Sequence, residues 1–163
     1  MGVNNAKTEL KATEQIISGL EDYQSKNWGI GLTGDTLQPD QFLAFYTQRG
    51  LPFEFYVRGP GVSLGDSSAY GQNIDTARNH MKNVRNHERE NVDKTVSQLQ
   101  DYQSRNWAIG LNGDTLKPDG FLTFFAQRGL PFSMYVRSQG VSVGDSSAYD
   151  KNINTLQEYI NSL

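Results

Sequence analysis

The chain has 163 residues, a formal net charge of -3 and no cysteine. That length suits one domain of ordinary size or two very small ones. The weak negative charge argues against general binding of nucleic acid polymers or anionic membranes. The lack of cysteine excludes disulfides, thiolate metal ligands and a cysteine nucleophile. No apolar run approaches the roughly 20 residues of a membrane-spanning helix. The absence of cysteine fits a reducing cytosol, so we expect a cytoplasmic protein, and we expect no cofactor.

The sequence repeats itself at an offset of 79 residues. Residues 22–79 match residues 101–158 at 39 of 58 positions without a gap, and GDSSAY occurs twice unchanged. The repeat predicts two tandem units, 1–84 and 85–163. Because each unit alone is small, we expect the two to pack with pseudo-twofold symmetry, as the halves of a homodimer do.

Each unit begins with a predicted helix, at 6–26 and at 87–105. Apolar residues recur there at spacings of three and four, which is typical of a helix with one buried face. The next segment reads NWGIGLTGD at 27–35 and NWAIGLNGD at 106–114. Its closely spaced Gly, Thr and Asn residues favour a loop containing a short strand.

A second helix is predicted at 39–49 and at 118–128. Pro39 stands where a first-turn proline belongs, and Asp40 suits the positive end of the helix. The sequence Arg-Gly-Leu-Pro that begins at position 49 predicts a helix end with Gly50 as the left-handed cap.

A strand follows at 52–58 and at 131–137, where apolar and polar residues alternate. A Gly-rich turn and a short second strand would complete a hairpin. No Gly or Pro occurs from Gln72 to Ala108, so one long helix is expected to join the units, although a change of apolar phase near His87 leaves a break there open. The predicted fold is α+β, and each repeat has the order α-(β)-α-β-(β)-α.

Two sequence features resemble functional motifs without meeting their requirements. Residues 29–34 fit GxGxxG, but a dinucleotide site needs a preceding strand and a following helix, and Ala108 replaces the first glycine in the second copy. His80 and His87 do not recur and are predicted to be solvated helix residues. No zinc site and no Ser-His-Asp triad can be assembled.

The best candidate site is the Gly/Ser loop that ends in GDSSAY and enters the last helix. Free amides at a helix N-terminus accept anions, and serine hydroxyls add donors. The strand before the loop presents Tyr56 and Arg58 on one face, where Arg58 could bind a phosphate or carboxylate with two donors. The predicted ligand-binding residues are Trp28, Tyr56, Arg58, Ser67 and Ser68, with the equivalents Trp107, Tyr135, Arg137, Ser146 and Ser147.

Capping and packing alone offer a competing interpretation of the same residues. Asp66, Ser67 or Ser68 would only cap the last helix. Arg58 would pair with Glu54 or with an aspartate of the same unit, and the tryptophan would belong to the core.

The sequence favours a non-enzymatic binding protein with two equivalent sites for an anionic small molecule such as a nucleotide. The alternative is a protein-interaction or assembly module, in which Trp28, Tyr46 and Tyr56 contact another protein or a second copy of the chain. A carboxylate-dependent hydrolase ranks third because no clear acid/base pair is visible, and no catalytic residue is assigned. The recurring carboxylates considered for it are Asp22, Asp35, Asp40 and Asp66.

Overall fold

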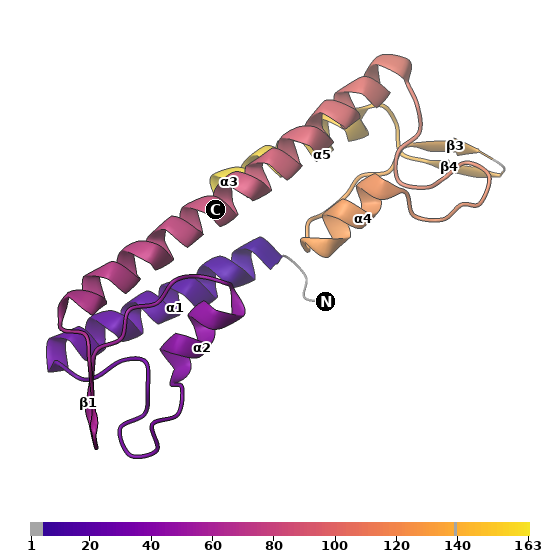
Figure 1. Ribbon diagram of the computed structural model, residues 1–163. Helices are drawn as coiled ribbons and strands as arrows, with labels where there is room; N and C mark the ends of the chain where they lie inside the picture. Colours follow the sequence, from indigo (N-terminus) through magenta and orange to yellow (C-terminus); the bar gives the residue numbers. More distant parts are fainter. Residues whose placement is uncertain (1–4, 139) are drawn as a thin grey trace. The chain divides into compact units, whose positions relative to one another are not determined.

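The computed structural model describes residues 5–138 and 140–163, which form five helices and two small antiparallel sheets (Figure 1). The first elements are α1 (Asn5–Lys26), α2 (Gln41–Gln48), β1 (Val57–Gly59) and β2 (Val62–Leu64). The later elements are α3 (Ser68–Arg105), α4 (Gly120–Gln127), β3 (Val136–Ser138), β4 (Val141–Val143) and α5 (Ser147–Asn161). This mixture confirms the predicted α+β class. Within the described ranges, no helix is both long and apolar enough to cross a bilayer.

The chain divides into two compact units. One is Glu9–Val84, and the other combines Arg85–Leu163 with residues 5–8. Helix α3 contributes to both units because it runs unbroken through His87 (Figure 1). The possible break at this residue is therefore not present. The pseudo-twofold packing of the two units stays a prediction.

Each unit encloses its own hydrophobic core, and residues 79 positions apart occupy both. In Glu9–Val84, the apolar faces of α1, α2 and α3 meet. The buried residues there include Leu20, Ile30, Phe42, Tyr46, Tyr70 and Ile74. In the other unit they include Leu99, Ile109, Phe121, Phe125, Tyr149 and Ile153.

Helix α2 begins later than predicted, at Gln41. Asp40 is its N-cap, and the carboxylate accepts a hydrogen bond from the backbone N–H of Leu43 at 3.0 Å. Pro39 therefore precedes the cap and does not lie in the first turn, which corrects the prediction. The predicted helix end is confirmed, since Gly50 follows the C-cap with a φ of 67°.

The observed strand β1 is shorter than the strand predicted at 52–58, because a side chain forms hydrogen bonds with the backbone of the earlier part of this segment. Asn73 of α3 is buried, and its Oδ1 accepts the N–H of Glu54 at 2.8 Å. Its Nδ2 donates to the carbonyl of Glu54, also at 2.8 Å. These two bonds satisfy the backbone N–H and carbonyl of Glu54 without a partner strand. The equivalent pair in the other unit is Asn152 and Ser133.

The predicted hairpin is confirmed in both units. Val57 pairs with Leu64, and Arg58 pairs with Ser63. Gly65 follows with a φ of +68°, and a Cβ there would lie 1.8 Å from the carbonyl oxygen of Phe55. Only glycine allows this close approach between the hairpin exit and the preceding segment.

Candidate functional site

Trp28 lies just beyond α1, with about half of its surface exposed. Asn27 takes a left-handed φ of 55°, and the N–H of Trp28 donates to the carbonyl of Tyr23 at 3.0 Å, which closes the helix. The rings of Tyr23 and Trp28 are in an edge-to-face arrangement, with their centroids 5.1 Å apart. Lys26 Nζ lies 4.4 Å from the centroid of the Trp28 ring. The alternative that Trp28 is a core residue is therefore wrong.

Tyr70 and Tyr56 connect the backbone of Trp28 to the hairpin. The hydroxyl of Tyr70 donates to the carbonyl of Trp28, and burial raises the pKa of Tyr70 above its ordinary value. The rings of Tyr56 and Tyr70 are edge-to-face, with their centroids 5.5 Å apart. The hydroxyl of Tyr56 donates to Asn27 Oδ1 at 3.2 Å. Tyr56 and Trp28 thus lie at the same end of the unit.

Arg58 of β1 uses its guanidinium to brace the hairpin. Its Nη1 donates to the carbonyls of Val57 at 2.9 Å and Leu64 at 3.2 Å. Its Nη2 donates to the carbonyl of Gly65 at 2.7 Å, and the guanidinium carbon lies 5.1 Å from the Tyr56 ring centroid. Three of its five N–H donors are therefore occupied by the backbone.

Asp66, which precedes α3, caps the N-terminal end of this helix. Asp66 Oδ1 accepts the backbone N–H of Ser68 at 2.9 Å and also the hydroxyl of Ser68. These bonds, helped by the charge of Arg58, hold the pKa of the Asp66 carboxyl below its usual value. The hydroxyl of Ser67 is exposed and has no hydrogen-bond partner within the described residues. A negative group already occupies the end of the helix that was predicted to receive an anion.

The second unit reproduces most of this arrangement, although the bond from the Tyr56 hydroxyl to Asn27 has no counterpart among the described residues. Arg137 donates to the carbonyls of Val136, Val143 and Gly144. Asp145 accepts from Ser147, while Ser146 stands at the N-cap of α5 without a side-chain capping bond. The phenol of Tyr149 bonds the carbonyl of Trp107 and its ring meets Tyr135 at 5.6 Å.

The exposed large hydrophobic side chains among the described residues are two pairs of repeat equivalents. Trp28 is 49% exposed and Trp107 47%, while Leu64 is 44% exposed and Val143 41%. The Trp28 surface is defined here as Lys26, Trp28, Tyr56, Arg58 and Leu64, and the Trp107 surface as Arg105, Trp107, Tyr135, Arg137 and Val143.

Tyr46 does not belong to the Trp28 surface, contrary to the interaction hypothesis. It is fully buried, and its hydroxyl donates to the backbone carbonyl of Asn73. Its place in the sequence does not reveal this, because the apolar face of α2 and an aromatic surface stripe have the same spacing.

The GxGxxG segment performs a packing role. The N–H of Gly31 donates to Asp40 Oδ2 at 2.6 Å, so a carboxylate of the same unit occupies it. Gly31 has a φ of +114°, and a Cβ there would lie 2.4 Å from the Phe55 ring. This geometry leaves no role for that amide in holding a pyrophosphate.

Three of the four recurring aspartates also have structural partners. Asp40 caps α2, Asp66 caps α3, and Asp22 forms an ion pair with Lys26 at 3.2 Å. Within the part of the chain that the structure describes, no group of three or more His, Asp or Glu residues could hold a metal ion.

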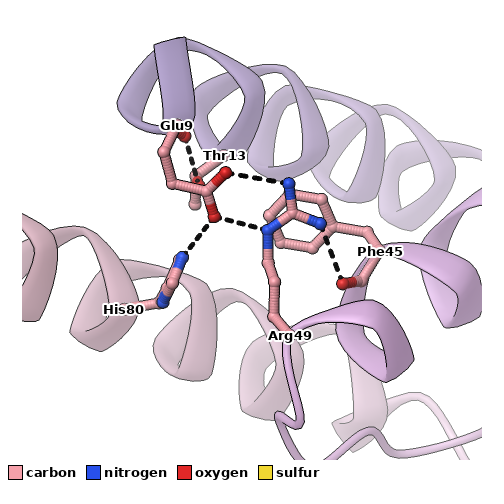
Figure 2. A network of polar contacts seen from close by, with 5 residues as sticks. All are labelled: Glu9, Thr13, Phe45, Arg49 and His80. Atoms are coloured by element: carbon pink, nitrogen blue, oxygen red, sulfur yellow. Dashed lines mark hydrogen bonds and ion pairs between the residues drawn. The ribbon is translucent and has the colours of Figure 1, made fainter. Parts of the chain in front are cut away.

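The structure reveals one polar cluster that sequence reasoning missed. Arg49, at the end of α2, pairs through Nε and Nη2 with the carboxylate of Glu9 on α1 (Figure 2). His80 Nε2 of α3 lies 2.6 Å from the same carboxylate, which can only accept, so this nitrogen carries the shared proton. His80 is half-buried, which corrects the prediction of a solvated residue.

The other unit carries the same cluster with one change. Glu88 accepts from Arg128 Nε at 2.6 Å and Nη2 at 3.1 Å, and Tyr159 takes the place of His80 with its hydroxyl donating to Glu88. The signal in the sequence was the matching separation of 40 residues between Glu and Arg in both copies. It was hidden because Glu9 and Glu88 lie outside the strongly matching segment.

Acid is expected to weaken the cluster around Glu9. Hydrogen bonds from Arg49 hold the pKa of Glu9 below its usual value. A carboxyl with a lowered folded-state pKa stabilises the fold above its unfolded-state pKa, and this contribution is lost as the pH falls through the folded pKa. In urea titrations, Glu9→Gln should therefore lose less stability than the wild type between pH 7 and pH 3. Equal losses would contradict a role for Glu9.

Comparisons of the chain with protein-family models, curated proteins and solved structures found no match.

Proposed function

We propose that the protein is a protein-interaction module with two like binding surfaces, the Trp28 surface and the Trp107 surface. The observation that carries the proposal is the exposure of Trp28, Leu64, Trp107 and Val143 at equivalent positions of the two units. Exposed apolar side chains that cluster beside polar ones mark interaction sites.

The chemistry of each surface suits a protein partner. Tryptophan, tyrosine and arginine dominate the binding energy of protein interfaces, and each surface offers all three. Arg58 and Tyr56 are held in place by backbone and ring contacts. Side chains that are already ordered lose little conformational entropy on binding.

The local charge also favours a protein partner over a small anion. Lys26 is paired with Asp22, and Arg58 lies beside the capping carboxylate of Asp66. These four charges balance. Two such surfaces on one chain would raise avidity for a partner that presents two copies of a target.

An anionic small molecule is the second candidate. Tyr56, Arg58 and Ser68 do lie near the start of α3, and Arg58 remains exposed with two N–H donors that have no partner in the described residues. Calorimetric titration with phosphate and with ATP tests this candidate. Binding that disappears in Arg58→Ala with Arg137→Ala would favour it over the interaction module.

The interaction module predicts a defined pattern of capture from an extract of the host cell. Immobilised wild-type protein should retain a protein that Trp28→Ala and Trp107→Ala each retain less well. The double variant should lose it, because both surfaces then lack their central side chain. Leu64→Ser with Val143→Ser should act in the same direction, whereas Lys11→Ala, an exposed change elsewhere on α1, should have no effect.

The captured protein would then be purified and titrated against each variant, with circular dichroism as a check on folding. Sedimentation of the purified chain tests a second copy as the partner. Capture that both tryptophan changes leave intact would overturn the proposal, as would a strictly monomeric chain that retains nothing.

A further inference from the structure

A pocket of about 630 Å³ lies within the unit formed by Arg85–Leu163. Helix α3 contributes Thr95, Gln98 and Tyr102, and the loop after α3 contributes Trp107 and Asn112. The start of α4 completes the lining. Small-molecule sites in proteins have volumes of about 300–1,000 Å³, so this pocket has room for one small ligand.

Aromatic rings form one wall and hold one another in place. The Tyr102 ring is edge-to-face with Trp107 and with Phe121, at centroid separations of 5.2 Å and 4.9 Å. Phe124 adds a further ring to the lining. Because such edge-to-face pairs fix ring orientation, the wall is formed before a ligand arrives.

Polar groups with unused hydrogen-bonding capacity face the same space. The carboxamides of Gln98 and Asn112 line the pocket, and neither has a hydrogen-bond partner in the described residues. Each carboxamide offers two donors and one acceptor. Thr95 donates its hydroxyl proton to the carbonyl of Asn91 at 3.1 Å, which leaves the hydroxyl oxygen as an acceptor.

The lining offers no free charge for an ionic ligand. No Lys, Arg or His lines the pocket. The carboxylate of Asp119 accepts three backbone N–H groups, from Gly110 at 2.7 Å and from Phe121 and Leu122 at 3.1 Å each. Its charge is thereby matched by the positive end of α4, so the pocket favours an uncharged ligand.

We propose that this pocket binds an uncharged polyhydroxylated small molecule that has one apolar face. The apolar face contacts the rings of Trp107 and Phe124, and the hydroxyl groups pair with Gln98 and Asn112. Saccharides and nucleosides both have this chemistry. The site is separate in function from the proposed protein-binding surfaces, although Trp107 lines both.

The other unit supplies a natural comparison, because two polar groups of this site are missing there and Asn112 is replaced by Thr33, whose hydroxyl bonds that of Thr36. Gly19 stands at the position of Gln98, and Ile16 stands at that of Thr95. A Cβ at Gly19 would lie 3.1 Å from the ring of Phe42, so this ring occupies the space beside the helix. Binding is therefore expected at Trp107 and not at Trp28.

The experiment uses tryptophan fluorescence, since the chain has two tryptophans. Trp28→Phe leaves Trp107 as the sole reporter, and Trp107→Phe leaves Trp28. Each full-length variant is titrated separately with glucose, maltose, cellobiose and adenosine. A saturable change with a sugar or with adenosine is expected only from the Trp107 reporter, and the ligand that binds identifies the source.

Adding Gln98→Ala and Asn112→Ala to the Trp107 reporter should weaken binding at least tenfold. Alanine is compatible with the helix at position 98, and circular dichroism checks that the fold is kept. Absence of a saturable response to all four compounds at millimolar concentration would overturn the proposal, as would an equal response from the Trp28 reporter or unchanged affinity after both substitutions.

These outcomes are separable from those of the interaction module. Gln98 and Asn112 lie outside the Trp107 surface, so their substitution should leave capture of a protein partner unchanged. Val143→Ser should conversely weaken capture while leaving the response to the small molecule intact.

Discussion

Replacing Arg128 with alanine is expected to lower the free energy of unfolding by about 3–5 kcal/mol, measured by urea denaturation at pH 7. The side chain of its partner Glu88 is only 7% exposed. Burial raises the pKa of Glu88, but hydrogen bonds from Arg128 and Tyr159 outweigh it and hold that pKa below its usual value. The carboxylate is therefore charged at neutral pH, and alanine would leave it buried without its cation.

The first unit supplies the matched control. Arg49 makes the same bidentate pair with Glu9, whose side chain is 25% exposed and also contacts His80. Because water screens this pair better, Arg49→Ala should cost less than about 3 kcal/mol. A loss equal to or greater than that of Arg128→Ala would show that burial of the carboxylate does not set the cost.

A second substitution distinguishes the buried charge from lost packing. Arg128 also lies over the ring of Phe124, 3.5 Å from its centroid. Combining Arg128→Ala with Glu88→Gln removes the unpaired charge but not the packing defect. We expect the double variant to be more stable than Arg128→Ala alone. A double variant no more stable than Arg128→Ala would show that the unpaired charge does not set the cost.

Asn152→Ala is expected to lower the free energy of unfolding by about 2–4 kcal/mol. Its buried carboxamide bonds both the N–H of Ser133 at 2.9 Å and the carbonyl of Ser133 at 2.8 Å. Alanine would leave both backbone groups without their partner while removing little apolar contact. Urea denaturation measures the loss.

The control is Asn154→Ala, the same change two residues along α5 at an exposed position. Surface substitutions of this kind usually change stability by less than about 0.5 kcal/mol. Similar losses for the two variants would mean that the Asn152 clamp contributes little.

Several elements of the fold could be predicted because their causes are local. The N-cap at Asp40 and the left-handed Gly50 depend on residues within one turn of α2. The hairpin could be placed from its glycines and its alternation. The start of α2 and the length of the strand were wrong because Asp40 acts as the cap and Asn73 occupies the backbone of Glu54.

The sequence indicated which of the candidate residues lie near one another better than it indicated their contacts. Tyr56 and Trp28 do lie at one end of their unit, connected through Tyr70. The donors of Arg58, in contrast, are mostly taken up by carbonyls of its own hairpin. Nothing in the local sequence specifies that use, because the guanidinium reaches six and seven residues along the chain to Leu64 and Gly65.

By itself, the sequence determined the repeat, the existence of the helices, the cap at Gly50 that ends α2, and which residue types recur. Tertiary structure alone decided that Tyr46 is buried while Trp28 is exposed, and that Glu9, Arg49 and His80 form one cluster. The physical reason is distance along the chain. A helix cap is satisfied within a few residues, whereas burial and ion pairing depend on segments about 40 or 70 residues apart that meet only when the core packs.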